Sequence, residues 1–374
     1  MADAAGAQLP SRRTLVFLRA TGATDRAIDG LVDELSAGFG ILSIDVPGVV
    51  GADGSAPAAV DEAADHVLRG ISEQALSRWL ICARSGYGEI VSAVVTRVLD
   101  GTASVFGLAG AVELASPSPV RETAGLPERH ETAVPRASFE APGAPANLVP
   151  RGGVAALAAL IAAFAEGAAF AGPEVPADFA RVIASPRTSS RTRGILARRL
   201  LADDASYRPT CLTPDQLVTL RAVADRVVPQ EGRAIDLAAR LDAQLARGEG
   251  DGWRSAELPT DPEAYSLALT ALGGLQDQTP ADQDARLQAV AASEYSPPGA
   301  ELTAAQLGTW FEDACADLTR LWLAHPASLA RVGFDGFATG GDAPRKLGFR
   351  VLSAGERESW EPRFDLLDTP GGRA

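Results

Sequence analysis

The sequence contains very little lysine, histidine, methionine or cysteine. Among its 374 residues Lys346 is the only lysine, one residue is methionine, and histidine and cysteine occur three times each. The cysteines, Cys82, Cys211 and Cys315, are odd in number and far apart, which argues against a disulfide framework and against the spacing of a metal site. Free thiols are typical of a reducing compartment, so we expect a cytoplasmic protein.

Long apolar runs and an excess of positive charge are also missing. No apolar run approaches the length needed to cross a bilayer, so we expect no membrane span. The formal net charge of −14 argues against nucleic acid and against anionic membranes as partners. Residues Ser11–Leu18 resemble a twin-arginine export motif, but Arg19 interrupts the apolar run, and we interpret this stretch as the approach to a first strand.

Short apolar runs alternate with segments of helical period in the first half of the chain. After a loose tail at 1–12, the expected strands are 15–18, 41–46, 79–83 and 103–109, and the expected helices are 23–39, 60–76 and 87–99. This alternation predicts a three-layer α/β domain with a parallel sheet at 13–172. A hinge at 173–208 follows, with a basic stretch at 187–193 that is either a solvated linker or an arm on an acidic partner.

The run C-A-R-S-G-Y-G, Cys82–Gly88, lies between the third expected strand and the next helix. Residues 13–170 resemble a trimmed α/β-hydrolase, in which this position carries the nucleophile. The resemblance implies Ser85 as the nucleophile of a serine esterase, with Glu113 and His130 as its supporting acid and base.

The sequence departs from the hydrolase pattern at the positions that catalysis requires. Ala83 and Tyr87 stand at the two glycine positions around the serine, and the loop at 145–147 has no histidine. Serine attack requires a base within hydrogen-bond reach. We therefore interpret the domain as a degenerate scaffold, a pseudoenzyme without catalytic, cofactor-binding or metal-binding residues, and keep the esterase as the alternative.

The second half, 209–374, has the pattern of a helical domain. Thr213-Pro214-Asp215-Gln216 predicts a helix start with a capping box, and Thr303 with Gln306 repeats the signature before a long helix. A glycine- and aromatic-rich loop follows the last expected helix at 333–349. Glycine permits tight turns, and the interleaved aromatic residues supply apolar area that favours docking against another surface.

Two stretches carry a family resemblance: this loop, and the run C-L-T-P-D-Q-L-V-T-L-R-A-V-A-D-R-V-V-P-Q at Cys211–Gln230. Through them, residues 209–362 resemble the gluconate 2-dehydrogenase subunit 3 family. The resemblance implies a non-catalytic accessory subunit that stabilises a flavin-dependent sugar or alcohol dehydrogenase of the glucose–methanol–choline type, with FAD bound by that partner. A transient assembly chaperone for the flavoprotein is a further alternative. The residues expected to contact the partner are Trp322, His325, Phe334, Phe337, Gly340, Gly341, Phe349 and Trp360.

Overall fold

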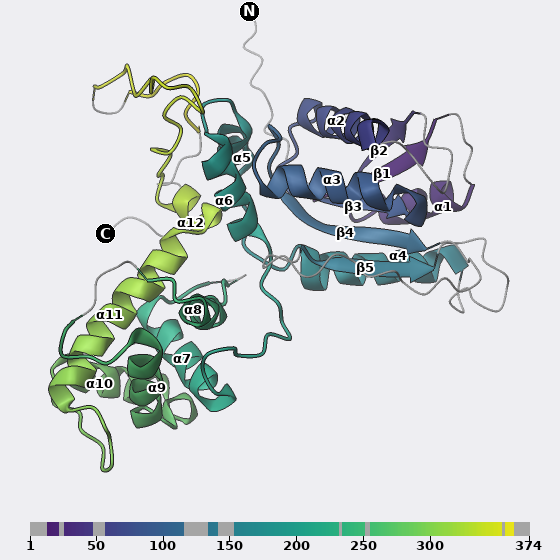
Figure 1. The fold of residues 1–374 in the computed structure, drawn as a ribbon. Helices are drawn as coiled ribbons and strands as arrows, with labels where there is room; N and C mark the ends of the chain where they lie inside the picture. The colour runs from purple at the N-terminus through teal and green to yellow at the C-terminus, as the bar shows by residue number, and fades with distance from the viewer. Residues whose placement is uncertain are drawn as a thin grey trace, which may run out of the picture. The chain divides into compact units, whose positions relative to one another are not determined.

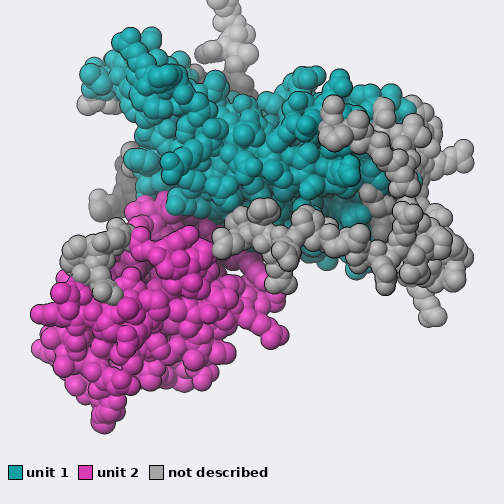
Figure 2. Space-filling model, in the orientation of Figure 1, with its two compact units in different colours: residues 1–202, 329–374 teal, residues 203–328 magenta. Residues whose placement is uncertain are grey.

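The computed structural model describes residues 13–21, 26–47, 57–115, 134–140, 153–231, 234–250, 255–353 and 356–362. Contacts group the chain into two compact units, shown in two colours in Figure 2: residues 1–202 with 329–374, and residues 203–328. The final part of the chain therefore groups with the first half. None of the helices in the described part of the chain is both long and apolar enough to cross a lipid bilayer.

The first unit contains a five-stranded parallel sheet with the order β2-β1-β3-β4-β5 (Figure 1). Its strands are β1 (Thr14–Ala20), β2 (Gly40–Val46), β3 (Trp79–Arg84), β4 (Leu108–Ala115) and β5 (Arg136–Glu140). The predicted α/β architecture with a parallel sheet is confirmed. This order occurs in doubly wound sheets, where the strand order reverses beside the first strand; the hydrolase-like interpretation stays a prediction.

Helices cover both faces of this sheet. They are α1 (Arg26–Leu35), α2 (Pro57–Glu73), α3 (Gly88–Leu99), α4 (Gly153–Phe164) and the π-helical turn η2 (Ala165–Ala169). Helix α2 packs beside α3, and α1 packs beside α4. Alternate residues of the central strands, such as Leu15 and Phe17, share one apolar core with Leu31 of α1 and Ile161 of α4. Burial on both faces explains why these strands read as continuous apolar runs.

The fourth strand begins five residues later than the sequence predicts. Residues 103–107 instead form an irregular segment before β4, and the backbone N–H of Trp79, the first residue of β3, donates to the Gly107 carbonyl at 2.9 Å. The indole Nε1 of Trp79 donates to the Phe106 carbonyl at 3.0 Å. Gly107 has a φ of +98°, and a Cβ there would lie 2.2 Å from the Ser77 carbonyl oxygen. A tertiary contact thus sets the start of β4.

The second unit is helical. Its elements are α7 (Pro214–Val227), α8 (Leu237–Ala246), α9 (Asp261–Ala271), the 3-10 turn η3 (Leu275–Asp277), α10 (Pro280–Ala291) and α11 (Ala304–Leu323). Helix α12 (Pro326–Arg331) leads back to the first unit. Both predicted capping boxes are confirmed: Thr213 and Thr303 each accept from the backbone N–H of a glutamine three residues on, and each glutamine bonds back.

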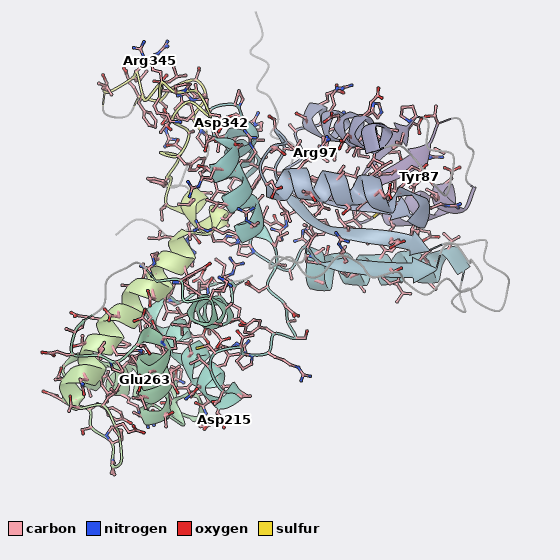
Figure 3. All side chains as sticks on the ribbon, viewed as in Figure 1. Tyr87, Arg97, Asp215, Glu263, Asp342 and Arg345 are labelled. Carbon is pink, nitrogen blue, oxygen red and sulfur yellow. The ribbon has the colours of Figure 1, made fainter. Side chains whose placement is uncertain are left out.

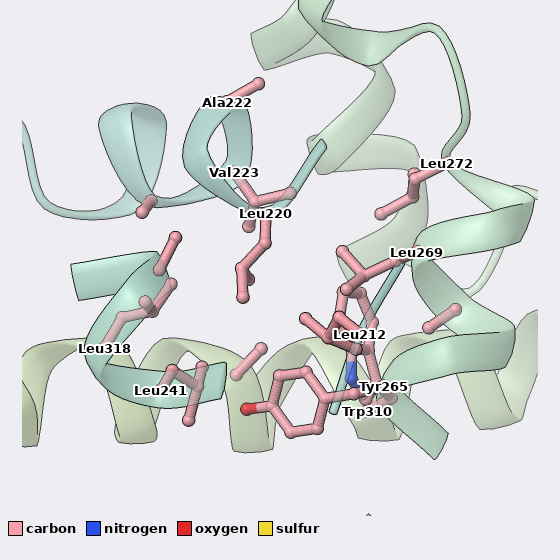
Figure 4. Close-up of a cluster of buried hydrophobic side chains, with 14 of the residues drawn as sticks. Leu212, Leu220, Ala222, Val223, Leu241, Tyr265, Leu269, Leu272, Trp310 and Leu318 are labelled. Atoms are coloured by element: carbon pink, nitrogen blue, oxygen red, sulfur yellow. The ribbon is translucent and has the colours of Figure 1, made fainter. Parts of the chain in front are cut away.

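Trp310 and Tyr265 lie in the core of the second unit, among leucines from α7, α8 and α9 (Figure 4). Their rings meet edge to face, with centroids 5.5 Å apart. The phenol of Tyr265 donates to the Asp317 carboxylate at 2.6 Å. Burial, together with that carboxylate, raises the pKa of Tyr265 well above its ordinary value. The Tyr265 hydroxyl thus has a partner inside the core, whereas the buried indole Nε1 of Trp310 has no hydrogen-bond partner among the described residues.

The carboxylate of Asp242, on α8, is fully buried and ties α8 to the loop before α7. It accepts from the hydroxyl of Tyr207 at 2.6 Å, from the N–H groups of Thr210, Cys211 and Leu212 at 2.7, 3.1 and 2.7 Å, and from the Thr210 hydroxyl at 3.2 Å. Burial by itself raises the pKa of a carboxyl, but these donors outweigh it and lower the pKa of Asp242. Burial and the same hydrogen bond raise the pKa of Tyr207 to about 12.

Candidate docking surface

A rigid turn in the first unit supports the residues that the sequence marks for docking. It joins α5 (Ala177–Ala184) to α6 (Ser190–Leu200). The Ser189 hydroxyl caps α6 by accepting from the backbone N–H of Thr192 at 3.2 Å. The Thr188 hydroxyl is buried and donates to the Val182 carbonyl at 2.8 Å. Hydrogen bonds within the turn therefore hold it in one conformation.

Arg193 fastens this turn to the sheet-bearing part of the unit. Its side chain is 4% exposed. The guanidinium donates to the carbonyls of Ile183, Ser185, Thr188, Gly101 and Ala103. Burial lowers the pKa of Arg193, and the nearby Asp342 opposes that effect. The basic stretch at 187–193 thus contributes an internal anchor, which composition alone did not indicate.

The C-terminal segment, residues 332–353 and 356–362, packs against the turn through its glycine backbone. The N–H groups of Gly340 and Gly341 donate to the Arg187 carbonyl at 2.9 and 2.6 Å. Gly341 has a φ of +68°, and a Cβ there would lie 2.1 Å from the Pro186 carbonyl oxygen. Glycine is the residue that fits such an approach. Both glycines were predicted to contact a partner, and here they make contacts inside the chain.

Two side chains that follow these glycines make further hydrogen bonds, one to the turn and one within the segment. The Asp342 carboxylate accepts from the backbone N–H and the hydroxyl of Ser190, with distances of 3.1 Å. The Lys346 ammonium donates to the Gly341 carbonyl at 2.7 Å. Figure 3 shows Asp342 beside the α5–α6 region, whereas Arg345 lies at the outer tip of the segment. The segment is held at its base and presents its tip outward.

Aromatic contacts complete the attachment. The Phe337 ring meets Phe179 of α5 edge to face, with centroids 5.6 Å apart. The Arg187 guanidinium lies 3.9 Å from the centroid of the Trp360 ring, and Phe349 packs on that ring at 5.3 Å. Such cation–π contacts stabilise by about 0.5–2 kcal/mol. Phe337 and Trp360 are half-buried, because part of each ring packs against other residues of the same chain.

The same segment carries most of the exposed large apolar side chains of the described residues. Eight such side chains are exposed, and five of them fall within 332–352. The five are Val332, Phe334, Leu347, Phe349 and Leu352. Phe334 is 53% exposed and Leu352 86% exposed. Scattered single apolar residues are normal on a surface, but a concentration in one ordered segment is typical of an interaction site.

The two remaining predicted docking residues belong to the second unit. Trp322 of α11 is half-buried against the core of that unit. His325 is 1% exposed, and its Nδ1 accepts from the backbone N–H of Ala327 at 3.2 Å, at the start of α12. Its position is that of a residue that fixes a helix junction.

The structure places two of the three hydrolase-type residues, and His130 lies outside the described residues. Ser85 begins a 3-10 turn, η1 (Ser85–Tyr87), that joins β3 to α3. Glu113 is exposed on the neighbouring β4 and pairs in register with Ala83, two residues before Ser85. Tyr87 is buried, which raises the pKa of its phenol. The hydrolase assignment stays a prediction.

In the part of the chain that the structure describes, no group of three or more histidine, cysteine, aspartate or glutamate side chains is placed to hold a metal ion. Burial raises the pKa of the Cys82 thiol far above its ordinary value, which makes it a poor nucleophile. Comparisons with protein-family models, with curated proteins and with solved structures find no match to this chain.

Proposed function

We propose that this chain is a non-catalytic accessory subunit that binds and stabilises a flavin-dependent sugar or alcohol dehydrogenase of the glucose–methanol–choline type. The family resemblance of residues 209–362 suggests the partner, which would bind the FAD. The observation that carries the proposal is the C-terminal segment, where five large apolar side chains are exposed on an ordered scaffold. Exposed apolar side chains of this kind become buried when subunits associate.

Co-expression tests the proposal. The chain is produced with the flavoprotein encoded by a neighbouring gene, and the flavoprotein is also produced alone. We expect the two proteins to elute together, and the flavoprotein alone to lose solubility and activity, because its apolar interface would be left open. If the flavoprotein is equally soluble and active alone and elutes separately, the proposal is wrong.

The purified complex also separates a permanent subunit from a transient chaperone. A subunit stays bound through purification in a fixed ratio, since its apolar surface remains covered. A chaperone improves the yield of the flavoprotein during expression and is absent from the final preparation. We expect the fixed ratio.

A further inference from the structure

At the carboxyl edge of the parallel sheet, strands β1 and β3 stop pairing before they end. The chain passes from β2 on one side of β1 to β3 on the other side. The pairing of β1 with β3 ends at Phe17 and Cys82, whereas β1 pairs with β2 as far as Ala20, and β3 pairs with β4 as far as Arg84. In open α/β sheets such a switch point is where ligands bind, outside the carboxyl ends of the strands.

Helix α3 begins at this switch point, directly after β3 and the short turn η1. Its N-cap residue, Tyr87, makes no side-chain hydrogen bond to the first turn of the helix. Gly86 and Gly88 are exposed, and beyond their chain neighbours no described atom lies within 4 Å of a Cβ built on either glycine. The first N–H groups of a helix favour an anion. Uncapped helix starts are common, so the indication of a ligand comes from the tyrosine.

Tyr87 differs from the other three tyrosines of the chain in its hydrogen bonding. The hydroxyls of Tyr207 and Tyr265 donate to carboxylates, and that of Tyr295 donates to the Ala271 carbonyl. Tyr87 is 8% exposed, yet its hydroxyl makes no hydrogen bond within the part of the chain that the structure describes. A buried tyrosine hydroxyl usually has a partner. This hydroxyl is therefore available to a group that the described residues do not supply.

The charges near the phenol place it at the switch point. Burial raises the pKa of Tyr87, Arg84 lowers that pKa and Asp45 raises it, so both charged groups lie close to the hydroxyl. Arg84 ends β3, and Asp45 belongs to β2, so the two charges come from the strands on either side of β1. Asp45 pairs in register with Arg19, whose guanidinium bonds to Asp29 at 2.7 Å. Figure 3 shows Tyr87 near the carboxyl ends of the strands.

We infer that this edge binds a small polar molecule that has an oxyanion group, phosphate or carboxylate, and a hydrogen-bond donor. The oxyanion accepts from the N–H groups at the start of α3, from the Tyr87 hydroxyl and from Arg84. The Asp45 carboxylate accepts from the donor of the ligand. Two further carboxylates near this edge, of Glu89 on α3 and Glu113 on β4, are exposed and restrict the oxyanion to the side of Arg84.

The inference goes beyond the proposed function, and its test needs only the intact chain. Amide NMR signals are followed while inorganic phosphate or acetate is added at constant ionic strength, with NaCl alone as the reference. We expect inorganic phosphate to shift the signals of Gly86 and Gly88 until they saturate. A tighter response to acetate identifies a carboxylate as the preferred group. If neither probe gives a saturable shift at these glycines, the inference is wrong, whether or not the chain binds a flavoprotein.

Substitutions at Gly86 provide a matched pair. The backbone of Gly86 is not left-handed and its Cβ has open space among the described residues, so a side chain fits there. Gly86→Asp places a carboxylate beside the start of α3 and should abolish the saturable shift of Gly88, because the added charge repels the oxyanion. Gly86→Asn has nearly the same shape without the charge and should keep it. Equal affinities in the two variants would overturn the assignment.

Two side-chain variants test the donors. Tyr87→Phe keeps the ring and removes the hydroxyl, and we expect it to weaken binding about tenfold, as the loss of one hydrogen bond to a charged group does. Arg84→Gln should weaken binding by a similar factor, whereas Arg69→Gln, an exposed site on α2, should bind like the wild type. Thermal unfolding checks that each variant is folded, and if Tyr87→Phe is not, the Gly86 pair decides. Unchanged affinity in a folded Tyr87→Phe would contradict the role of the hydroxyl.

Discussion

At the scale of single residues, Asp242 shows how a buried charge can organise a loop. Its carboxylate accepts five hydrogen bonds, three of them from the backbone N–H groups of the successive residues Thr210, Cys211 and Leu212, which precede α7. An asparagine has nearly the same shape, but its amide nitrogen donates and would face these donors. We expect Asp242→Asn to lower the free energy of unfolding by about 3 kcal/mol. Chemical denaturation measures it, and Asp33→Asn, on the exposed surface of α1, is the control. Equal effects at the two sites would contradict this role.

The same carboxylate should make stability depend on pH. Its pKa in the folded protein is lowered, so its contribution is complete above the unfolded pKa of about 3.9 and is lost as pH falls through the folded value. We expect the stability difference between wild type and Asp242→Asn to be constant above about pH 5 and to shrink below about pH 4. Denaturation curves across this range measure it. A difference that grows on acidification would contradict the sign.

Gly341 and Gly348 provide a matched pair in the C-terminal segment. Both have positive φ, +68° and +62°, but a Cβ at Gly341 meets the Pro186 carbonyl, whereas a Cβ at Gly348 has open space around it. Gly348→Ala should cost only the left-handed strain of about 1–2 kcal/mol. Gly341→Ala should also separate the segment from the turn, because a backbone carbonyl cannot move away cheaply. Hydrogen exchange of the Gly340, residue 341 and Leu347 amides should accelerate in Gly341→Ala and much less in Gly348→Ala. Equal rates in both variants would show that the close approach is unimportant.

At the scale of elements, two threonines with the same position at a helix start differ in bonding. Thr213 caps α7 through its side chain, whereas Thr260 precedes α9 without a side-chain cap. Thr213→Ala should lower the free energy of unfolding by about 1 kcal/mol. Thr260→Ala should have a smaller effect, since no cap is lost. Both are exposed, so denaturation midpoints compare the caps directly. A larger loss for Thr260→Ala would contradict the assignment.

The elements that could be predicted from the sequence are those with local signals. The apolar runs at 15–18, 41–46 and 79–83 lie within strands β1, β2 and β3, and the Thr-x-x-Gln signatures mark α7 and α11. The start of β4 was predicted too early, because the approach of Gly107 to Ser77 has no local signature. Helices α5 and α10 were not predicted. Prolines surround α5, and the apolar stripe of α10 is weak, so neither segment shows a clear helical pattern.

For the candidate docking surface too, the local features could be predicted from the sequence and the long-range contacts could not. Six of the predicted docking residues lie in one segment because they are contiguous or nearly so in the sequence. Their attachment to the α5–α6 turn joins residues 152 apart, such as Ser190 and Asp342, and no short-range pattern encodes such a contact. The burial of His325 and the five-carbonyl role of Arg193 likewise depend on tertiary packing. Composition identified the segment, and only the structure separates its inward-facing from its exposed side chains.

At the scale of the whole molecule, each unit has an apolar core of its own. We therefore expect two unfolding transitions. Asp242→Asn should lower the midpoint temperature of only one transition, the one that amide exchange in α7 and α8 reports. Trp79→Phe removes the hydrogen bond from the indole to the Phe106 carbonyl. It should lower the midpoint temperature of only the other transition, the one that amide exchange in β1 and β3 reports. Calorimetry combined with peptide-level exchange measures both. A uniform shift of all peptides in either variant would mean that the molecule unfolds as one cooperative body.

The first unit is also discontinuous in the chain, and this affects its biosynthesis. A ribosome releases the α5–α6 turn long before the residues that cover it, since Asp342 follows Ser190 by 152 positions. At elongation rates of about 5–20 residues per second, the interval is roughly 8–30 s. Throughout that time the nascent chain presents Phe179 and the Arg187 carbonyl without their eventual contacts from Phe337 and the two glycines. Residues synthesised later therefore complete the unit that contains the sheet, and a polypeptide truncated before Phe337 would have the sheet but an uncovered α5–α6 turn.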